Sequence, residues 1–108
     1  MVVKRFEVYL VILDPAKGSE IQKTRPCLVV SPNEMNNSLD TILAVPLTST
    51  IRNYPTRVDC SFKNKNGQLA IDQMRALDKS RLIKRLGVIN DRVVIESVLN
   101  VLQEIFAL

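Results

Sequence analysis

An Asn66-Gly67 dipeptide that follows a stretch of alternating polar and apolar residues is the feature that most constrains the fold of this 108-residue chain. Asn-Gly is the strongest short signal for a β-hairpin, because both central positions of its tight turn need positive φ. Residues 57–62 alternate cleanly before it, so residues 68–74 are expected to pair back with them as an antiparallel strand. The same alternation predicts that Asp72 points away from the core.

Other stretches rich in β-branched and apolar residues predict further strands. They cover residues 6–13, 27–31, 39–48 and 83–89. Pro46 lies in the third of these and lacks a backbone N–H, which indicates a bulge or an edge position. Turn-forming residues predict single helical turns at 31–37 and 78–81.

After residue 89 the apolar residues change to helical spacing, with Asn90 or Asp91 as the expected N-cap. Their side chains form one stripe that is expected to face the sheet. The stripe consists of Val94, Ile95, Val98, Leu99, Leu102, Ile105 and Phe106. Short consecutive strands followed by one helix predict a mostly β fold of the small α+β kind, an antiparallel barrel with a C-terminal helix.

The length and the charge of the chain set broad limits. A chain of 108 residues is the common size of one domain, and we expect residues 1–108 to form a single core. Fifteen Lys and Arg against eleven Asp and Glu give a net charge of +4, which mildly favours polyanionic partners. A solvated basic surface without a nucleic-acid partner is equally compatible with that charge.

Cys27 and Cys60 lie in strand-like stretches without metal-ligand spacing, so we interpret them as reduced packing residues. The apolar run at residues 8–13 ends at Asp14-Pro15 and is too short for a signal peptide or a membrane span. We therefore expect a protein of the cytoplasm that does not associate with a membrane.

The absence of histidine excludes the usual acid–base pair for RNA cleavage, the Ser-His-Asp triad and nearly all zinc sites. A Gly-rich loop of the GxxxxGK[ST] kind is also absent from the sequence, which argues against nucleotide hydrolysis. Phosphate chemistry would have to use Arg, hydroxyls and carboxylates. The planar guanidinium of Arg is suited to hold a phosphate or its more highly charged transition state.

Several ordered blocks resemble a known family. They are Asp14-Pro15-Ala16-Lys17-Gly18-Ser19-Glu20, Lys23-Thr24-Arg25-Pro26, Val45-Pro46-Leu47-Thr48-Ser49 and Ala70-Ile71-Asp72-Gln73-Met74-Arg75-Ala76-Leu77-Asp78. Together with the final helix they resemble the MazF/PemK toxins over nearly the whole chain. The resemblance implies an SH3-like or CcdB-like barrel and a sequence-selective, metal-independent endoribonuclease without a cofactor. It also implies a homodimer that binds single-stranded RNA and a small antitoxin protein with an acidic segment that blocks the RNA groove.

The resemblance also places the catalytic residues. The essential Arg of the family falls on Arg25, and its Ser or Thr after the third strand falls on Thr48. The 2′-hydroxyl of RNA would attack the neighbouring phosphate while Arg25 neutralises developing charge and Thr48 donates to a phosphate oxygen. Glu20 has a family counterpart, but the general base stays open, since Arg25 is always protonated and Glu20 or Asp72 would need a raised pKa.

Substrate contacts are expected at positions in and after the first loop and beside the later strands. They are Lys17, Ser19, Lys23, Thr24, Ser49, Tyr54, Asp72 and Gln73. One plasmid-borne branch of the family uses a His and an Arg where this chain has Ser19 and Ala70, so its mechanism does not transfer. Phe6 stands where the family commonly has Gly.

Further aromatic and basic residues surround the predicted hairpin and can either stack bases and follow phosphates or form a solvated basic surface. They are Tyr54, Phe62, Arg52, Arg57, Lys63 and Lys65. The alternative function is a toxin without nuclease activity, either a CcdB-like gyrase poison or a module that binds RNA without cutting it. The cleaved RNA motif is not readable from the sequence.

Overall fold

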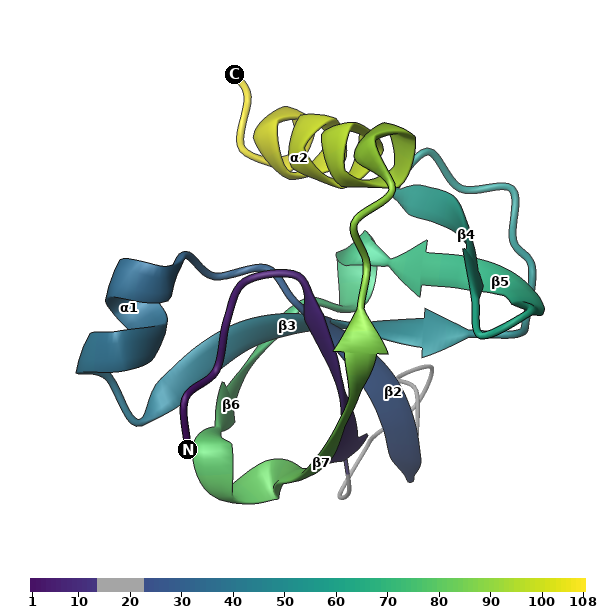
Figure 1. Ribbon diagram of the computed structural model, residues 1–108. Helices are drawn as coiled ribbons and strands as arrows, with labels where there is room; N and C mark the ends of the chain where they lie inside the picture. The colour runs from purple at the N-terminus through teal and green to yellow at the C-terminus, as the bar shows by residue number, and fades with distance from the viewer. Residues whose placement is uncertain (14–22) are drawn as a thin grey trace.

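The computed structural model describes residues 1–13 and 23–108, and Figure 1 shows their arrangement. The described strands are β1 (Glu7–Ile12), β2 (Thr24–Val29), β3 (Thr41–Thr48), β4 (Arg57–Phe62), β5 (Lys65–Ala70), β6 (Arg75–Asp78) and β7 (Leu82–Val88). The helices are α1 (Asn33–Ser38), α2 (Arg92–Ile105) and the 3-10 turns η1 (Ile71–Gln73) and η2 (Lys79–Arg81). The other expected strands, the C-terminal helix and the two expected helical turns are confirmed, with ends shifted by a few residues. The strand expected over residues 68–74 is wrong in its bounds, because β5 begins at Lys65 and residues 71–73 form η1. β6 was missed because it is short and mostly charged or exposed.

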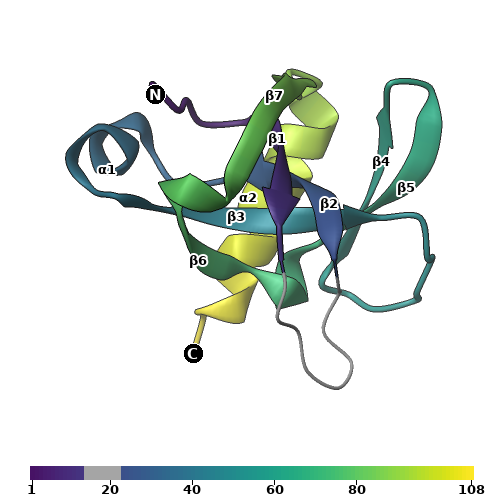
Figure 2. The same cartoon turned by 90° about the horizontal axis from the view of Figure 1, so that it is seen from below.

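The strands form one antiparallel sheet in the order β4-β5-β3-β2-β1-β7, with β6 pairing along β3. β4 and β7 are the edges of this order, so the sheet curls without closing (Figure 2). The expected barrel is therefore correct for the curvature of the sheet, but the barrel is open between β4 and β7. The two edges still approach each other through side chains. A Cβ on Gly87 of β7 would lie 3.2 Å from the ring of Phe62, the last residue of β4.

The position expected for the hairpin turn is wrong. Lys63 and Asn64 occupy the turn, with φ values of 51° and 64°, and Phe62 pairs with Lys65. Asn66-Gly67 lies two residues further on, inside β5. The observed register pairs buried Val58 with buried Leu69, which burial of apolar area favours over the local preference of Asn-Gly for a turn.

Pro46 lies at the point where the strand that pairs with one side of β3 changes from β6 to β5. β6 pairs with residues 41–44 of β3 and β5 pairs with residues 47–48, while β2 lies along the other side opposite Pro46. Because Pro46 falls between the residues that pair with β6 and those that pair with β5, the missing N–H of proline interrupts no pairing on that side. β3 is an interior strand, so the expected bulge or edge position is replaced by a gap between two partner strands.

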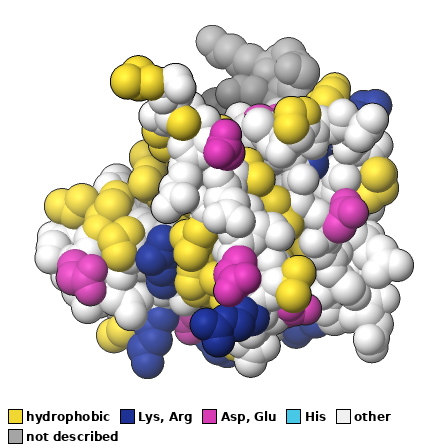
Figure 3. Space-filling model, turned by 90° about the horizontal axis from the view of Figure 1, so that it is seen from above, with side chains coloured by type: hydrophobic (Ala, Val, Ile, Leu, Met, Phe, Trp, Pro, Cys, Tyr) yellow, Lys and Arg dark blue, Asp and Glu magenta, His cyan; other side chains and the backbone are white. Residues whose placement is uncertain are grey.

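The helix α2 packs against β4 and η1 and completes one half of the core. Asp91 caps it by accepting hydrogen bonds from the backbone N–H groups of Val93 and Val94, as expected for one of the two candidate caps. Val98 is fully buried, but Ile105 and Phe106 are exposed, so the stripe covers the sheet only along its first part. Figure 3 shows hydrophobic side chains exposed on the face of the molecule seen from above.

Both cysteines are buried and free, which confirms their interpretation as packing residues. Burial raises the pKa of the Cys27 thiol to about 12 and outweighs the opposite effect of the positive charge of Arg75. Burial also raises the pKa of the Cys60 thiol, so neither thiol is an activated nucleophile. Within residues 1–13 and 23–108, none of the helices has the length and apolar character that crossing a membrane requires.

Phe6 adopts a left-handed backbone, with φ at 70°. Its N–H donates to the Val29 carbonyl and its carbonyl accepts from the Ile89 N–H, so this conformation joins the end of β2 to the end of β7. A non-glycine residue pays roughly 1–3 kcal/mol in this region, which gives a physical reason for the glycine common in the family. The Phe6 ring offsets part of that cost because it packs on the core. The Arg5 guanidinium also lies over the ring, 5.0 Å from the ring centroid.

Glu7 is a buried carboxylate at the start of β1. Burial would raise its pKa, but hydrogen bonds from the Lys4 N–H, from Arg85 and from the Tyr9 hydroxyl lower the pKa below 4.5. A lowered pKa in the folded state means that this stabilisation is present above the unfolded pKa and is lost as the pH falls through the folded pKa.

We therefore expect Glu7→Gln to lower the free energy of unfolding by about 1–3 kcal/mol at pH 7, since three donors lose a charged acceptor. The deficit should shrink as the pH falls below about 4, the ordinary pKa of a Glu carboxyl, and on through the lowered pKa of the folded state. Urea unfolding across pH 3–7 measures both effects, with exposed Glu104→Gln on α2 as the matched control. A deficit that is constant across this range would contradict the assigned pKa direction.

Candidate functional site

The start of β2 and the end of β3 lie side by side at one end of the sheet, because the two strands are antiparallel neighbours. Arg25 and Pro26 from β2 line a cleft there together with Thr48 and Ser49 from the end of β3. The cleft has a volume of about 350 Å³. The structure thus brings together two residues that are far apart in the sequence and that were expected to act on the same phosphate.

Thr48 is the last residue of β3 and is half-buried. Its Oγ1 accepts a hydrogen bond from the Thr50 N–H at 3.1 Å. This contact is the local pairing expected for a Thr at a strand end, and it also orients the side chain. Because the hydroxyl acts as acceptor in this contact, its proton is available to donate to a ligand.

Gly67 of β5 allows the close approach of β5 to Thr48. A Cβ at Gly67 would lie 2.6 Å from the Thr48 carbonyl oxygen, closer than real Cβ contacts. This position therefore requires glycine for space, since its φ is not positive. Asn66-Gly67 thus contributes to the cleft wall and not to the hairpin turn.

The tip of the β4–β5 hairpin supplies the other wall. Phe62, Lys63 and Lys65 line the cleft opposite Arg25. The Lys63 ammonium lies 5.9 Å from the centroid of the Phe62 ring, at the limit of a cation–π contact. Arg25, Lys63 and Lys65 are all exposed, so the cleft presents three cations to solvent. It therefore favours a polyanion.

A model of the family described as PemK-like, MazF-like toxin of type II toxin–antitoxin system matches residues 4–106. The chain belongs to this family. The expectation that the resemblance of its sequence blocks raised is therefore confirmed at the level of the family.

Solved structures agree with the assignment. A crystal structure of MazF from Deinococcus radiodurans is 26% identical, with a TM-score of 0.86 over 100% of this chain and 99% of that one. An endoribonuclease in complex with its cognate antitoxin, from a mycobacterial species, is also 26% identical, with a TM-score of 0.79 over 94% and 92%. A mycobacterial endoribonuclease is 25% identical, with a TM-score of 0.77 over 96% and 90%.

The predicted site residues of this family member divide into four groups. Arg25, Thr48 and Ser49 line the cleft. Lys17, Ser19 and Glu20 lie outside the described residues. Lys23 and Thr24 precede Arg25 in the sequence and are exposed. The backbone carbonyl of Lys23 accepts a hydrogen bond from the Leu13 N–H at 2.9 Å.

The fourth group, like Lys23 and Thr24, does not line the cleft and consists of Tyr54, Asp72 and Gln73. Tyr54 is exposed and carries the Arg57 guanidinium 5.2 Å from its ring centroid. Asp72 points away from the core as predicted, and it accepts from Arg57 Nε at 2.8 Å and from the Thr56 hydroxyl at 3.1 Å. These contacts tie η1 to the start of β4.

The surroundings of Asp72 are unfavourable for a general base. Burial would raise the pKa of its carboxyl, but the hydrogen bonds from Arg57 and Thr56 outweigh burial and lower the pKa below 3.8. A base of that strength holds a proton poorly near neutral pH. The raised pKa that the sequence argument required for Asp72 is therefore absent.

Phe62, Lys63 and Lys65 were expected either to stack bases and follow phosphates or to form a solvated basic surface, and they were not joined to Arg25 and Thr48 in one site. The misplaced turn explains this omission, because the turn at Lys63-Asn64 brings the hairpin tip to the cleft. The sequence signals were the aromatic and basic residues around the hairpin and the excess of positive charge.

Proposed function

We propose that residues 1–108 form one toxin domain that cleaves single-stranded RNA sequence-selectively in the cleft between Arg25 and the β4–β5 hairpin, without a metal ion. The observation that carries this proposal is the convergence of Arg25, Thr48, Lys63 and Lys65 on one cleft. Three cations provide affinity for the phosphates of RNA, since most of that affinity is electrostatic.

The chemistry follows from the two groups at the edge of the sheet. The RNA 2′-hydroxyl loses its proton and its oxygen attacks the adjacent phosphorus, while the bond to the 5′-oxygen of the next nucleotide breaks. That oxygen takes up a proton from solvent, so a 2′,3′-cyclic phosphate and a 5′-hydroxyl end result. The Arg25 guanidinium stabilises the charge on the pentacoordinate phosphate, and the Thr48 hydroxyl donates to one of its oxygens. The group that takes the 2′-hydroxyl proton is left open, with Glu20 retained as the carboxylate candidate.

An unstructured RNA incubated with the purified protein in EDTA tests this proposal. We expect cleavage at a limited set of sites, with 2′,3′-cyclic phosphate ends identified by mass spectrometry. Lys84→Ala on β7 is the control for loss of one positive charge, because Lys84 is exposed and does not line the cleft. RNAs of many sequences left intact by the wild-type protein would overturn the proposal, and gyrase-dependent DNA breakage would support the CcdB-like alternative.

Asp72→Asn is expected to keep the cleavage rate within about tenfold of wild type, because Asp72 is held by Arg57 and its pKa is lowered. A lost general base would cost about 10²–10⁴-fold. Single-turnover cleavage at pH 6–8 measures the difference, with exposed Asp40→Asn as the matched control. A loss of a hundredfold or more would assign the base to Asp72.

We further propose that the functional unit is a homodimer in the cytoplasm and that a small antitoxin places an acidic segment in the cleft. The three cations of the cleft support this partner, and the mycobacterial relative that was solved with its antitoxin provides a precedent. Co-expression with the product of an adjacent small open reading frame should relieve growth arrest. Harmless overexpression of the protein alone would count against a toxin.

A further inference from the structure

Gln68 of β5 is a buried polar residue beside the cleft, with 5% of its surface exposed. Its Oε1 accepts from the Arg52 N–H at 3.0 Å, and its Nε2 donates to the Arg52 carbonyl at 3.2 Å. Nε2 also donates to Asp59 Oδ1 on β4 at 2.9 Å. One side chain therefore pairs with both backbone groups of Arg52 and is itself anchored by the neighbouring strand.

This pairing uses all the hydrogen-bonding capacity that a buried amide must satisfy, because both Nε2 protons and the carbonyl oxygen have partners. The two bonds to Arg52 resemble the exchange between residues of paired strands, although residues 51–54 are not in a strand. The Gln68 side chain thus supplies the hydrogen bonds that a neighbouring strand would otherwise make to the backbone of Arg52.

The clamped segment leads directly away from Thr48. The Thr50 N–H is bound to Thr48 Oγ1, Ser49 lines the cleft, and Arg52 is held by Gln68. Residues 49–52 are therefore fixed at both ends by hydrogen bonds, and the Thr48 hydroxyl is oriented at one of those ends. The hydrogen bonds at Thr50 and Arg52 therefore also set the position of Ser49 in the cleft wall.

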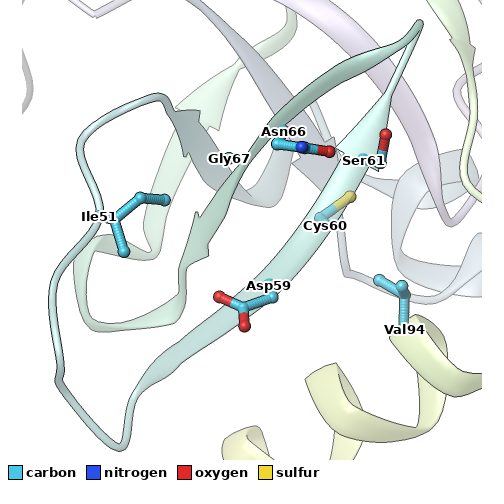
Figure 4. A pocket seen from close by; sticks show the side chains of 7 residues that line it. All are labelled: Ile51, Asp59, Cys60, Ser61, Asn66, Gly67 and Val94. Atoms are coloured by element: carbon cyan, nitrogen blue, oxygen red, sulfur yellow. The ribbon is translucent and has the colours of Figure 1, made fainter.

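Apolar packing contributes little to holding this segment. Ile51 is 61% exposed and borders a hollow of about 470 Å³ between the segment and the hairpin. Figure 4 shows its side chain pointing from the loop towards the hairpin, with Asp59 and Gly67 on the strands opposite. Because burial does not fix the segment, its position depends on the Gln68 amide.

We propose that Gln68 is a positioning residue for RNA cleavage, which holds residues 49–52 so that the Thr48 hydroxyl and Ser49 face the reacting phosphate. This inference rests on the proposed endoribonuclease function. A loosened segment leaves the cations of the cleft in place, so RNA binding is retained, but the hydroxyl is misaligned in the transition state. Displacement by about 1 Å costs on the order of 10²-fold in rate.

Gln68→Met tests the proposal, because it removes the three hydrogen bonds and keeps the length and the apolar part of the side chain. We expect kcat to fall by about 10–100-fold with KM within about threefold, and hydrogen exchange at the Arg52 amide to accelerate. Gln103→Met, at an exposed position of α2, is the matched control. Assays are run at a temperature at which circular dichroism shows every variant fully folded.

A rescue variant separates positioning from general stability. Gln68→Glu retains the acceptor for the Arg52 N–H, but it places a carboxylate against Asp59 and should be at least as impaired as Gln68→Met. Adding Asp59→Asn supplies an amide that donates to Glu at position 68, so kcat should recover by at least about threefold.

Wild-type kcat in a folded Gln68→Met protein, or no recovery in the double variant, would overturn the role of Gln68. A wild-type protein that cleaves no RNA would overturn the proposed function. The wild-type assay comes first, so this result is distinguished from a failure of the role of Gln68.

Discussion

Replacing Arg25 by alanine is expected to slow RNA cleavage by at least about 10²–10³-fold, the loss typical of one group that stabilises transition-state charge. Arg25 is exposed at the start of β2, and its side chain makes no hydrogen bond or ion pair with another residue of 1–13 or 23–108. The change should therefore leave the fold nearly intact. Single-turnover cleavage gives the rate, and thermal unfolding checks that the stability is unchanged within about 0.5 kcal/mol.

Two further variants separate charge from geometry at this position. Arg25→Lys keeps the positive charge but loses the planar fork that can donate two parallel hydrogen bonds, so it should recover only part of the rate. Lys84→Ala controls for the net charge of the chain. Cleavage by Arg25→Ala within threefold of the Lys84→Ala rate would remove Arg25 from the mechanism.

Replacing Gly67 by alanine is the second change with a large expected effect. The new methyl group would meet the Thr48 carbonyl oxygen at 2.6 Å, and a backbone atom cannot move aside as a flexible side chain can. β3 and β5 would have to separate at the point where Leu47 pairs with Leu69. We expect a loss of about 1–3 kcal/mol in the free energy of unfolding, together with reduced cleavage, because Thr48 shifts with its carbonyl.

Gly87→Ala is the matched control for this change. Its new methyl group would lie 3.2 Å from Phe62 Cζ, the edge of a ring that can turn, and neither glycine has a positive φ. Gly87→Ala should therefore cost clearly less stability than Gly67→Ala in urea unfolding. Equal losses at the two positions would show that the contact with the Thr48 carbonyl is not what excludes a side chain from position 67.

Much of the fold was predictable because it depends on local patterns. The alternation of residues 57–62, the apolar stripe of α2 and the Asp91 cap are short-range features. The alternation and the cap appear as expected, and the stripe does so along the first part of α2. β6 was not predictable, because its four residues include three with charged or exposed side chains and its pairing with β3 supplies its order. The misplaced turn shows the limit of local propensity. Lys63-Asn64 and Asn66-Gly67 could each form the hairpin turn, and tertiary packing selected Lys63-Asn64.

The candidate site was partly predictable for a different reason. Arg25 and Thr48 stood out because their blocks resemble a family, and the absence of histidine left few other groups for phosphate chemistry. The contributions of Lys63, Gly67 and Gln68 depend on the register of β4 against β5 and of β5 against β3. Register is decided by which apolar side chains are buried together, and no short window of sequence contains that information.

The sequence by itself therefore determined the order and type of most elements, the basic charge and the pair Arg25 and Thr48. Only the tertiary structure decided that the hairpin turns at Lys63-Asn64 and so brings its cations to Arg25. It also decided that Asn66-Gly67, the strongest turn signal in the chain, serves as a cleft wall against Thr48. The physical reason is that burying Val58 against Leu69 outweighs the conformational preference of one dipeptide.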